Sequence, residues 1–141
     1  MPIFNRLAKA AMKPVPRMLT PRGHSVADYV TVGTLLAGAV WFWPRSKRAA
    51  LGALICGAAN LAASLLTDYP GGLKKSISFR RHQDIDLGLA AMTATMPEFL
   101  AFRDEPQKKF FLAQGALITA LAELTQFPET PQRVEKGAEA A

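Results

Sequence analysis

Apolar residues of this chain gather in four stretches of similar length, and most charged residues lie between them. The stretches cover residues 26–43, 49–67, 85–102 and 110–127. Each is close to the ~20 residues, within a range of about 17–25, that an α-helix needs to cross the hydrocarbon of a bilayer. The charges are not interspersed along the stretches, as they are in the amphipathic helices of soluble proteins. The pattern therefore predicts four transmembrane helices.

The four stretches form two copies of one unit. Residues 20–70 align without a gap with residues 78–128, a shift of 58 positions that leaves eleven of the 51 pairs identical. The identical pairs include Arg22/Arg80, His24/His82, Asp28/Asp86, Gly57/Gly115 and Thr67/Thr125. A repeat of this size is normally one supersecondary unit that cannot bury its apolar surface alone. We therefore expect an all-α, four-helix transmembrane bundle made of two tandem two-helix repeats, with residues 22–128 as the membrane domain.

Each stretch also carries small residues four positions apart. They are Gly33/Ala37, Ala49/Ala53/Gly57, Ala90/Ala94 and Ala116/Ala120. Lipid offers helices no hydrophobic reason to associate, so close approach of the backbones through small side chains takes over that role. Their presence in all four stretches favours a compact bundle.

The two ends of the chain differ from the repeats. Residues 1–21 form a basic segment, in which we interpret Pro2–Lys13 as a short amphipathic helix on the membrane surface. In that interpretation Arg6, Lys9 and Lys13 lie opposite an apolar face and meet anionic lipid. A disordered basic leader is the alternative. Residues 129–141 mix charges with proline and alanine, and predict a disordered tail.

The net charge of +6 bears on membrane topology. No basic stripe with interleaved aromatic residues follows a single helix, so a nucleic-acid partner is not expected. Eleven of the lysines and arginines lie in the two ends and in the loop between the repeats, and six lie in the two other turns. The positive-inside rule then places both termini in the cytoplasm. Trp41 and Trp43, at the far end of the first stretch, are expected to anchor it at the lipid headgroups.

Motifs of enzyme chemistry are missing from the sequence. There is no Gly-rich phosphate loop, no serine or cysteine nucleophile beside a base, and no histidine pair at zinc-protease spacing. The single cysteine, Cys56, lies within the second stretch and allows no intrachain disulfide. We therefore expect a protein that is not an enzyme.

The candidate site consists of two histidine–aspartate pairs, His24/Asp28 and His82/Asp86. Residues four apart share one face of a helix, and two-span repeats bring both pairs to the same side of the membrane. Ionisable groups inside a span are costly and point to a function. Three interpretations stay open. The pairs form a charge-neutralised structural collar together with Arg22 and Arg80, or they bind a divalent metal such as zinc, manganese or iron, or the histidines are axial ligands of haem or chlorophyll.

Proton-coupled transport is a fourth hypothesis for the same residues. Asp28, Asp86 and Glu123 could then line a cytoplasmic vestibule, with Asn60 deeper in the membrane and Glu98 near the outer face. Glu123 has no acidic counterpart in the first copy, because the equivalent residue there is Leu65. Glu123 therefore breaks the symmetry of the repeat. Its simpler interpretation is as an ion-pair partner of Arg22, Arg80 or a histidine. The cofactor, if any, is not identified by these patterns.

The motifs His24-x-x-x-Asp28-Tyr29, Leu66-Thr67-Asp68-Tyr69 and His82-x-x-x-Asp86, with Pro97 fifteen residues past the second histidine, are typical of one family. In these motifs residues 22–128 resemble the bacterial SPW-repeat family of small integral membrane proteins. Met96-Pro97-Glu98 stands at the position of the Ser-Pro-Trp tripeptide. The resemblance implies two helical hairpins in a bacterial inner membrane, and it carries no established activity.

These observations together lead to an expected role. The apolar faces with small residues suit contacts between helices, and the cationic ends suit lipid headgroups or an acidic partner. We expect a scaffold or accessory subunit of a membrane complex, whose partners are the lipid bilayer and other membrane protein subunits.

Overall fold

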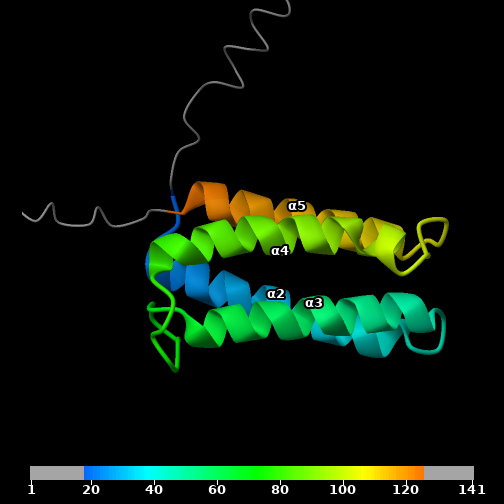
Figure 1. Ribbon diagram of the computed structural model, residues 1–141, viewed down its shortest axis with the longest axis horizontal. Helices are drawn as coiled ribbons and strands as arrows, with labels where there is room; N and C mark the ends of the chain where they lie inside the picture. Colours follow the sequence, from blue (N-terminus) through cyan, green and yellow to red (C-terminus); the bar gives the residue numbers. More distant parts are fainter. Residues whose placement is uncertain (1–17, 126–141) are drawn as a thin grey trace, which may run out of the picture.

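The computed structural model describes residues 18–125, and these residues form four α-helices (Figure 1). The helices are α2 (Pro21–Phe42), α3 (Lys47–Leu66), α4 (Phe79–Phe99) and α5 (Lys108–Leu124). No strand occurs within residues 18–125, which carry only two isolated β-bridges. The predicted all-α class and the four-helix bundle are confirmed. The predicted surface helix with Arg6, Lys9 and Lys13, and the predicted tail, lie outside the described residues.

Hydroxyl side chains define where three of the helices begin. Thr20 accepts a hydrogen bond from the Gly23 amide at 3.1 Å, and Pro21 occupies the first turn, where its missing N–H costs nothing. Ser78, the counterpart of Thr20 in the second copy, accepts from the Arg81 amide in the same way. Ser46 caps α3 through the Ala49 amide. The N-terminal ends of α2 and α4 are therefore built alike, which sets both copies in the same register.

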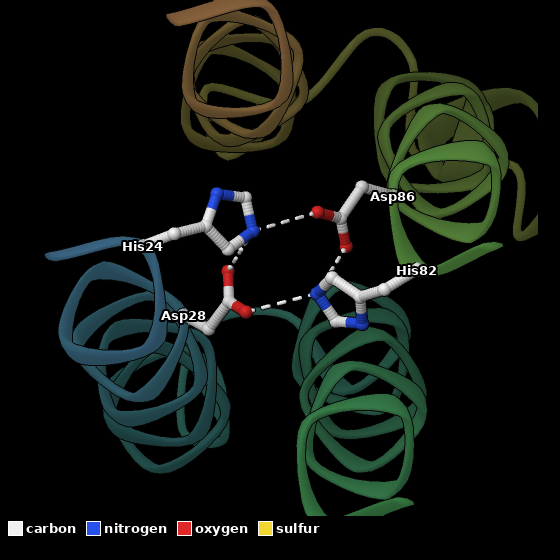
Figure 2. Close-up of side chains that lie close together, drawn as sticks. All are labelled: His24, Asp28, His82 and Asp86. Atoms are coloured by element: carbon white, nitrogen blue, oxygen red, sulfur yellow. Dashed lines mark hydrogen bonds and ion pairs between the residues drawn. The ribbon is translucent and has the colours of Figure 1, made fainter. Parts of the chain in front are cut away.

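The four helices pack as two antiparallel hairpins. The first hairpin is α2 with α3 and the second is α4 with α5, and they lie against each other through α3 with α4 and α2 with α5 (Figure 1). α2 and α4 run in the same direction and lie diagonally across the bundle (Figure 2). The β-bridges Leu19–Thr125 and Thr67–Ile77 join the start of each copy to the end of the other. These four positions are related by the 58-residue shift, so the hairpins obey an approximate two-fold symmetry.

The apolar core lies toward the end of the bundle that carries the two short turns. Its buried members include Leu35, Phe42, Met96, Phe102 and Phe111. The two hairpins close tightly at the identical glycines Gly57 and Gly115. A Cβ atom at Gly57 would lie 2.8 Å from the Leu36 side chain, and one at Gly115 would lie 2.9 Å from the Ala90 carbonyl oxygen. Small residues allow close approach at Gly57, which belongs to a predicted series, and at Gly115, which does not. The predicted pairs Gly33/Ala37 and Ala116/Ala120 are exposed and do not pack inside the bundle.

Two of the described helices, α2 and α3, are long and apolar enough to cross a membrane. The sequence pattern predicted four such helices. α5 has 17 residues, and α4 carries Arg80, Arg81, Asp84, Asp86 and Glu98, which lower its hydropathy. A buried helix of a soluble protein passes the same test of length and composition. The distribution of side chains over the surface of the bundle is therefore a stronger indicator of its surroundings than hydropathy.

Replacing Gly115 with valine is expected to lower the free energy of unfolding by about 1–3 kcal/mol, because overpacking forces the backbones of α4 and α5 apart. A Cβ atom there would also lie 2.9 Å from the Ala94 Cβ. Gly88→Val is the matched control, because nothing lies within 4 Å of a Cβ at Gly88 and the change in helix propensity from glycine to valine is the same. Thermal unfolding followed by circular dichroism measures both. Equal losses in the two variants would contradict the close packing at Gly115.

Candidate functional site

Two histidines and two aspartates meet inside the bundle and form a closed set, which we call the His–Asp ring: His24, Asp28, His82 and Asp86 (Figure 2). His24 and Asp28 come from α2, and His82 and Asp86 come from α4. The Nε2 atom of His24 lies 3.2 Å from Asp28 Oδ1 and 3.0 Å from Asp86 Oδ2. The Nε2 atom of His82 lies 2.9 Å from Asp28 Oδ2 and 3.2 Å from Asp86 Oδ1. Each histidine therefore contacts both carboxylates, and each carboxylate contacts both histidines.

Helical spacing and the repeat bring these four side chains together. A spacing of four residues places each histidine and its aspartate on one face of the helix. Because α2 and α4 begin alike and run in the same direction, both pairs lie at the same end of the bundle (Figure 1). The face of α2 that carries His24 and Asp28 and the face of α4 that carries His82 and Asp86 both point toward the bundle axis. The four side chains therefore connect two helices that lie diagonally opposite each other. The sequence prediction that the pairs come to the same end agrees with this placement.

The ring is shielded from solvent. The exposed fraction of the side chain is 0% for His24, 1% for His82, 4% for Asp86 and 12% for Asp28. The aromatic ring of Phe79 stands edge-on to His24 at 5.6 Å between centroids. A buried ion set of this kind is stable only when its hydrogen-bonding groups are satisfied.

Tyr69, in the loop between the hairpins, covers the ring and also contacts it. Its ring centroid lies 5.3 Å from that of His82, and its hydroxyl donates a hydrogen bond to Asp28 Oδ2 at 2.9 Å. Burial raises the pKa of the Tyr69 hydroxyl, which keeps it protonated and able to donate. Asp28 is therefore held by three donors, two imidazoles and one phenol.

Two threonines orient the histidines from outside the ring. His24 Nδ1 lies 2.5 Å from Thr125 Oγ1, and His82 Nδ1 lies 2.7 Å from Thr67 Oγ1. Each threonine hydroxyl already donates its hydrogen to a backbone carbonyl one turn earlier in its own helix. The threonine oxygen can therefore only accept, so each Nδ1 carries a hydrogen and donates it. Each bond joins a histidine of one copy to a threonine of the other.

The hydrogen-bond pattern determines the charge of the ring. Each Nε2 faces carboxylate oxygens, which accept hydrogen bonds, so each Nε2 also carries a hydrogen. Both imidazoles are then cationic, and two positive charges balance the two carboxylates. The ring is electrically neutral by itself and needs no further cation.

This balance explains where the structure places the other predicted members of the cluster. Arg22, Arg80 and Glu123 are exposed, and no ion pair within residues 18–125 includes any of them. The structure therefore does not bring them into the ring, which corrects the predicted collar. The positive charge that balances the aspartates comes from the two histidines, whereas the predicted collar took it from Arg22 and Arg80.

The predicted interface anchors lie at the opposite end of the bundle. Trp41 and Trp43 are both largely exposed. The Arg45 guanidinium lies 4.4 Å from the centre of the Trp41 ring, and Lys47 Nζ lies 3.8 Å from that of Trp43. Cations over exposed tryptophan faces form a polar–aromatic border at this end.

Sequence reasoning did not assign a role in the site to Thr67, Thr125, Tyr69 or Phe79. A signal for the threonines was present, because Thr67 and Thr125 are one of the identical pairs of the repeat. Their contact with the histidines depends on how far each helix is rotated about its axis. That rotation is a property of packing and is not encoded in the spacing along the chain.

Replacing Tyr69 with phenylalanine removes the third donor to Asp28 and keeps the aromatic cover. We expect a loss of about 1 kcal/mol in the free energy of unfolding, the usual net value of one hydrogen bond. Tyr29→Phe is the matched control, because the Tyr29 hydroxyl bonds the Gly71 carbonyl at the exposed surface. Unfolding curves of the two variants compare these contributions. A larger loss for Tyr29→Phe would contradict a special role for Tyr69.

The ring offers ligand atoms for a metal ion. One ligand atom from each of the four residues can be chosen so that all four lie within 4.8 Å of one another. The carboxylates occupy the space between the two Nε2 atoms, as Figure 2 shows, so this space suits a single ion better than a haem or chlorophyll macrocycle.

Comparison with known proteins assigns no family. No protein-family model, curated protein or solved structure matches the chain. The resemblance to the SPW-repeat family therefore stays a prediction from the sequence motifs.

Proposed function

We propose that this chain is a multi-pass integral membrane protein whose four helices cross the bilayer, and that it acts as a non-catalytic scaffold or accessory subunit of a membrane complex. The single observation that carries the proposal is the distribution of polar and apolar side chains over the bundle. Many polar side chains lie inside the bundle beside its apolar core, and many large apolar side chains lie on its outer surface.

The inside of the bundle holds an unusual share of polar side chains. The buried polar residues include His24, Ser25, Thr31, Asn60, Ser64, Thr67, His82, Asp86, Thr93, Gln114 and Thr125. The exposed large apolar residues of the helices include Val26, Val30, Val40, Trp41, Leu51, Leu54, Ile55, Leu87, Phe99, Leu112 and Leu117. Soluble proteins bury apolar residues and rarely expose large apolar patches. A hydrocarbon solvent reverses this preference, so the distribution supports lipid as the surroundings.

The hydroxyl groups of the helices support the same surroundings. Thr31, Thr34, Thr93, Thr95 and Thr119 each donate a hydrogen bond to a backbone carbonyl one turn earlier in the same helix. Thr34 and Thr95 do so away from the buried core. In hydrocarbon a hydroxyl has no water to bond, so a partner on its own helix is needed.

The proposed topology follows from the charges. The ring, the loop between the hairpins and both ends of the chain belong to the more basic side, which the positive-inside rule assigns to the cytoplasm. The resemblance in the sequence motifs suggests a bacterial inner membrane. Trp41 and Trp43 would then lie at the outer headgroup boundary.

The outer surface of the bundle supports a role in contacts with other helices. Gly33 and Ala37 are exposed on α2, and Ala116 and Ala120 are exposed on α5. Nothing lies within 4 Å of a Cβ at Gly33. Small residues four apart on a lipid-facing surface allow a second helix to approach closely. They are not used inside this bundle, so they are available to a partner.

The interior favours a scaffold over proton-coupled transport. The apolar core of Leu35, Met96 and Phe111 lies between the ring and the opposite end. Glu98, the predicted outer acid, is exposed and pairs with Arg103 at 3.4 Å. Asn60, the predicted deeper polar group, donates to the Cys56 carbonyl of its own helix. These groups do not form a chain from the ring across the bundle.

Extraction from membranes tests the proposal. We expect the full chain to stay in the membrane after washing at alkaline pH, to need detergent for solubilisation, and to be purified with a partner subunit after mild solubilisation. Recovery of a monodisperse helical protein from a detergent-free cytosolic extract would overturn the membrane proposal. A detergent-solubilised monomer with no bound protein would overturn the subunit proposal alone.

Two variants test whether the exposed face of α2 that carries Gly33 and Ala37 contacts a partner helix. Gly33→Leu combined with Ala37→Leu is expected to abolish the association with the partner, because the added side chains keep a second helix away. Val30→Leu, on the same face of α2, adds bulk where a large residue is already exposed, and is expected to leave the association unchanged. An unchanged association in the double variant would contradict the assignment of this face.

A further inference from the structure

We propose that the His–Asp ring binds one divalent first-row transition-metal ion, held by Nε2 of His24 and His82 and by the carboxylates of Asp28 and Asp86. This site goes beyond the scaffold role and does not depend on it, because all four ligands come from this chain. The ion would join α2 and α4, and so the two hairpins.

The distances in the ring are close to those of a metal site. Ligand atoms about 2.0–2.2 Å from a tetrahedral zinc ion lie about 3.3–3.6 Å from one another. The nitrogen–oxygen contacts of the ring measure 2.9–3.2 Å, and one ligand atom per residue can be chosen with all separations below 4.8 Å. The contacts must open by a few tenths of an ångström and the longer separations must shorten. Rotations of the four side chains about their Cα–Cβ and Cβ–Cγ bonds would supply both changes.

The threonines give each histidine the orientation that metal binding requires. A histidine that binds a metal through one nitrogen almost always donates the other N–H to a neighbouring oxygen, which determines the tautomer and the direction of the ring. Here Nδ1–H of His24 donates to Thr125 and Nδ1–H of His82 donates to Thr67. Both Nε2 atoms consequently point into the ring, toward the carboxylates. Two independent supports of this kind, related by the repeat, are the strongest argument for the site.

The exchange of protons for metal keeps the buried site neutral. In the ring as described, one hydrogen on each Nε2 completes two imidazolium cations, which balance two carboxylates. A divalent ion enters as both Nε2 hydrogens leave as protons, so two positive charges replace two positive charges. No additional charge is created in a poorly solvated interior, where an unbalanced charge costs several kcal/mol as a rule.

The ligand set selects the class of metal. Two imidazoles and two carboxylates suit zinc, iron, manganese or cobalt, whereas magnesium and calcium prefer oxygen ligands alone. The ring includes no thiolate, since Cys56 lies in α3 away from it. Four protein ligands under the cover of Phe79 and Tyr69 correspond to a closed, structural site, in contrast to a catalytic site with an open position.

Metal titration of the purified full chain in detergent tests the proposal. After treatment with a chelator, Zn²⁺ is expected to bind with a stoichiometry of one ion per chain. Co²⁺, used as a spectroscopic probe, is expected to give the visible absorption of a four-coordinate site, and X-ray absorption is expected to show two nitrogen ligands. These measurements use only the wild-type protein and decide the question even when a variant fails to fold. Absence of stoichiometric binding, or a site with oxygen ligands alone, would overturn the proposal.

Variants then locate the ion. Asp28→Asn combined with Asp86→Asn keeps the shapes of the side chains and is expected to abolish stoichiometric binding. Asp84→Asn, on the exposed face of α4, is the matched control and is expected to bind as the wild type does. Stoichiometric binding that survives in a folded double variant would place the ion elsewhere and overturn the assignment.

The threonines are positioning residues, and a separate pair of variants tests them. Thr67→Val combined with Thr125→Val keeps the four ligands and removes both acceptors of Nδ1–H. The affinity for Zn²⁺ is expected to fall about 10–100-fold while the stoichiometry stays at one. The conservative pair Thr67→Ser and Thr125→Ser is expected to restore most of the affinity. Equal affinities in the valine and serine pairs would contradict the orienting role.

Discussion

Replacing Asp86 with alanine is expected to lower the free energy of unfolding of the metal-free protein by about 3–5 kcal/mol, the cost of removing one partner from a buried ion set. Asp86 contacts both histidines, and its side chain is only 4% exposed. Its removal leaves two imidazoles that share a single carboxylate, so one buried positive charge has no balancing partner. Unfolding of the detergent-solubilised protein, followed by circular dichroism, measures the loss.

The position of each aspartate gives an internal comparison. Asp28→Ala is expected to cost at least as much as Asp86→Ala, because it also leaves the Tyr69 hydroxyl without its acceptor, which outweighs the 12% exposure of the Asp28 side chain. Asp84→Ala, on the outer face of the same helix as Asp86, is expected to change stability by less than about 0.5 kcal/mol. A loss for Asp84→Ala as large as that for Asp86→Ala would refute the special role of the ring.

Removing the whole ring at once separates charge balance from packing. Replacing both histidines with leucine and both aspartates with valine eliminates every charge of the ring and changes the side-chain volumes only moderately. Substitution of an entire buried ion set by apolar residues is often neutral or stabilising, so we expect this variant to be more stable than Asp86→Ala. It is also expected to lose stoichiometric Zn²⁺ binding. A quadruple variant as unstable as the single one would mean that the side-chain shapes, and not the charges, are essential.

The affinity for Zn²⁺ is expected to fall about a hundredfold for each unit by which pH is lowered, because binding releases two protons. The sign follows from the hydrogen-bond pattern of the ring. Both Nε2 atoms carry hydrogens in the metal-free state, so protons and metal compete for the same two nitrogens. Lower pH favours the protonated ring, and higher pH favours the metal-bound ring.

Two measurements check this dependence. Titrations with Zn²⁺ at several pH values give the slope, and calorimetry in buffers of different ionisation enthalpy gives the number of protons released. The Thr67→Val and Thr125→Val pair serves as a control, because it lowers the affinity without removing an Nε2 hydrogen, so the release of two protons is expected to persist. An affinity independent of pH would contradict the proton count.

Much of the architecture was predictable because it depends on patterns that are local or periodic. The caps Thr20 and Ser78 start α2 at Pro21 and α4 at Phe79, five and six residues before the predicted apolar stretches that begin at residues 26 and 85, because the polar first turns of both helices do not register as apolar. The 58-residue repeat specifies that these helices run in the same direction. A spacing of four residues then puts each histidine above its aspartate, so the meeting of two pairs at one end follows from the sequence.

Mean hydropathy alone is a poor indicator of whether α4 can cross a membrane. Hydropathy counts every charge on α4 against membrane insertion, although Asp86 is buried and balanced within the ring. A polar side chain that faces the interior does not meet lipid at all. The helix can therefore suit a bilayer better than the average of its residues indicates.

The chain by itself determined two like hairpins, their common polar end and the four residues able to meet there. Only the tertiary structure decided that Thr67 and Thr125 orient the histidines and that Arg22, Arg80 and Glu123 stay outside. The physical reason is that sequence spacing states which residues share a face of one helix. The direction of that face toward another helix depends on rotation about the helix axis, which close packing across the bundle determines.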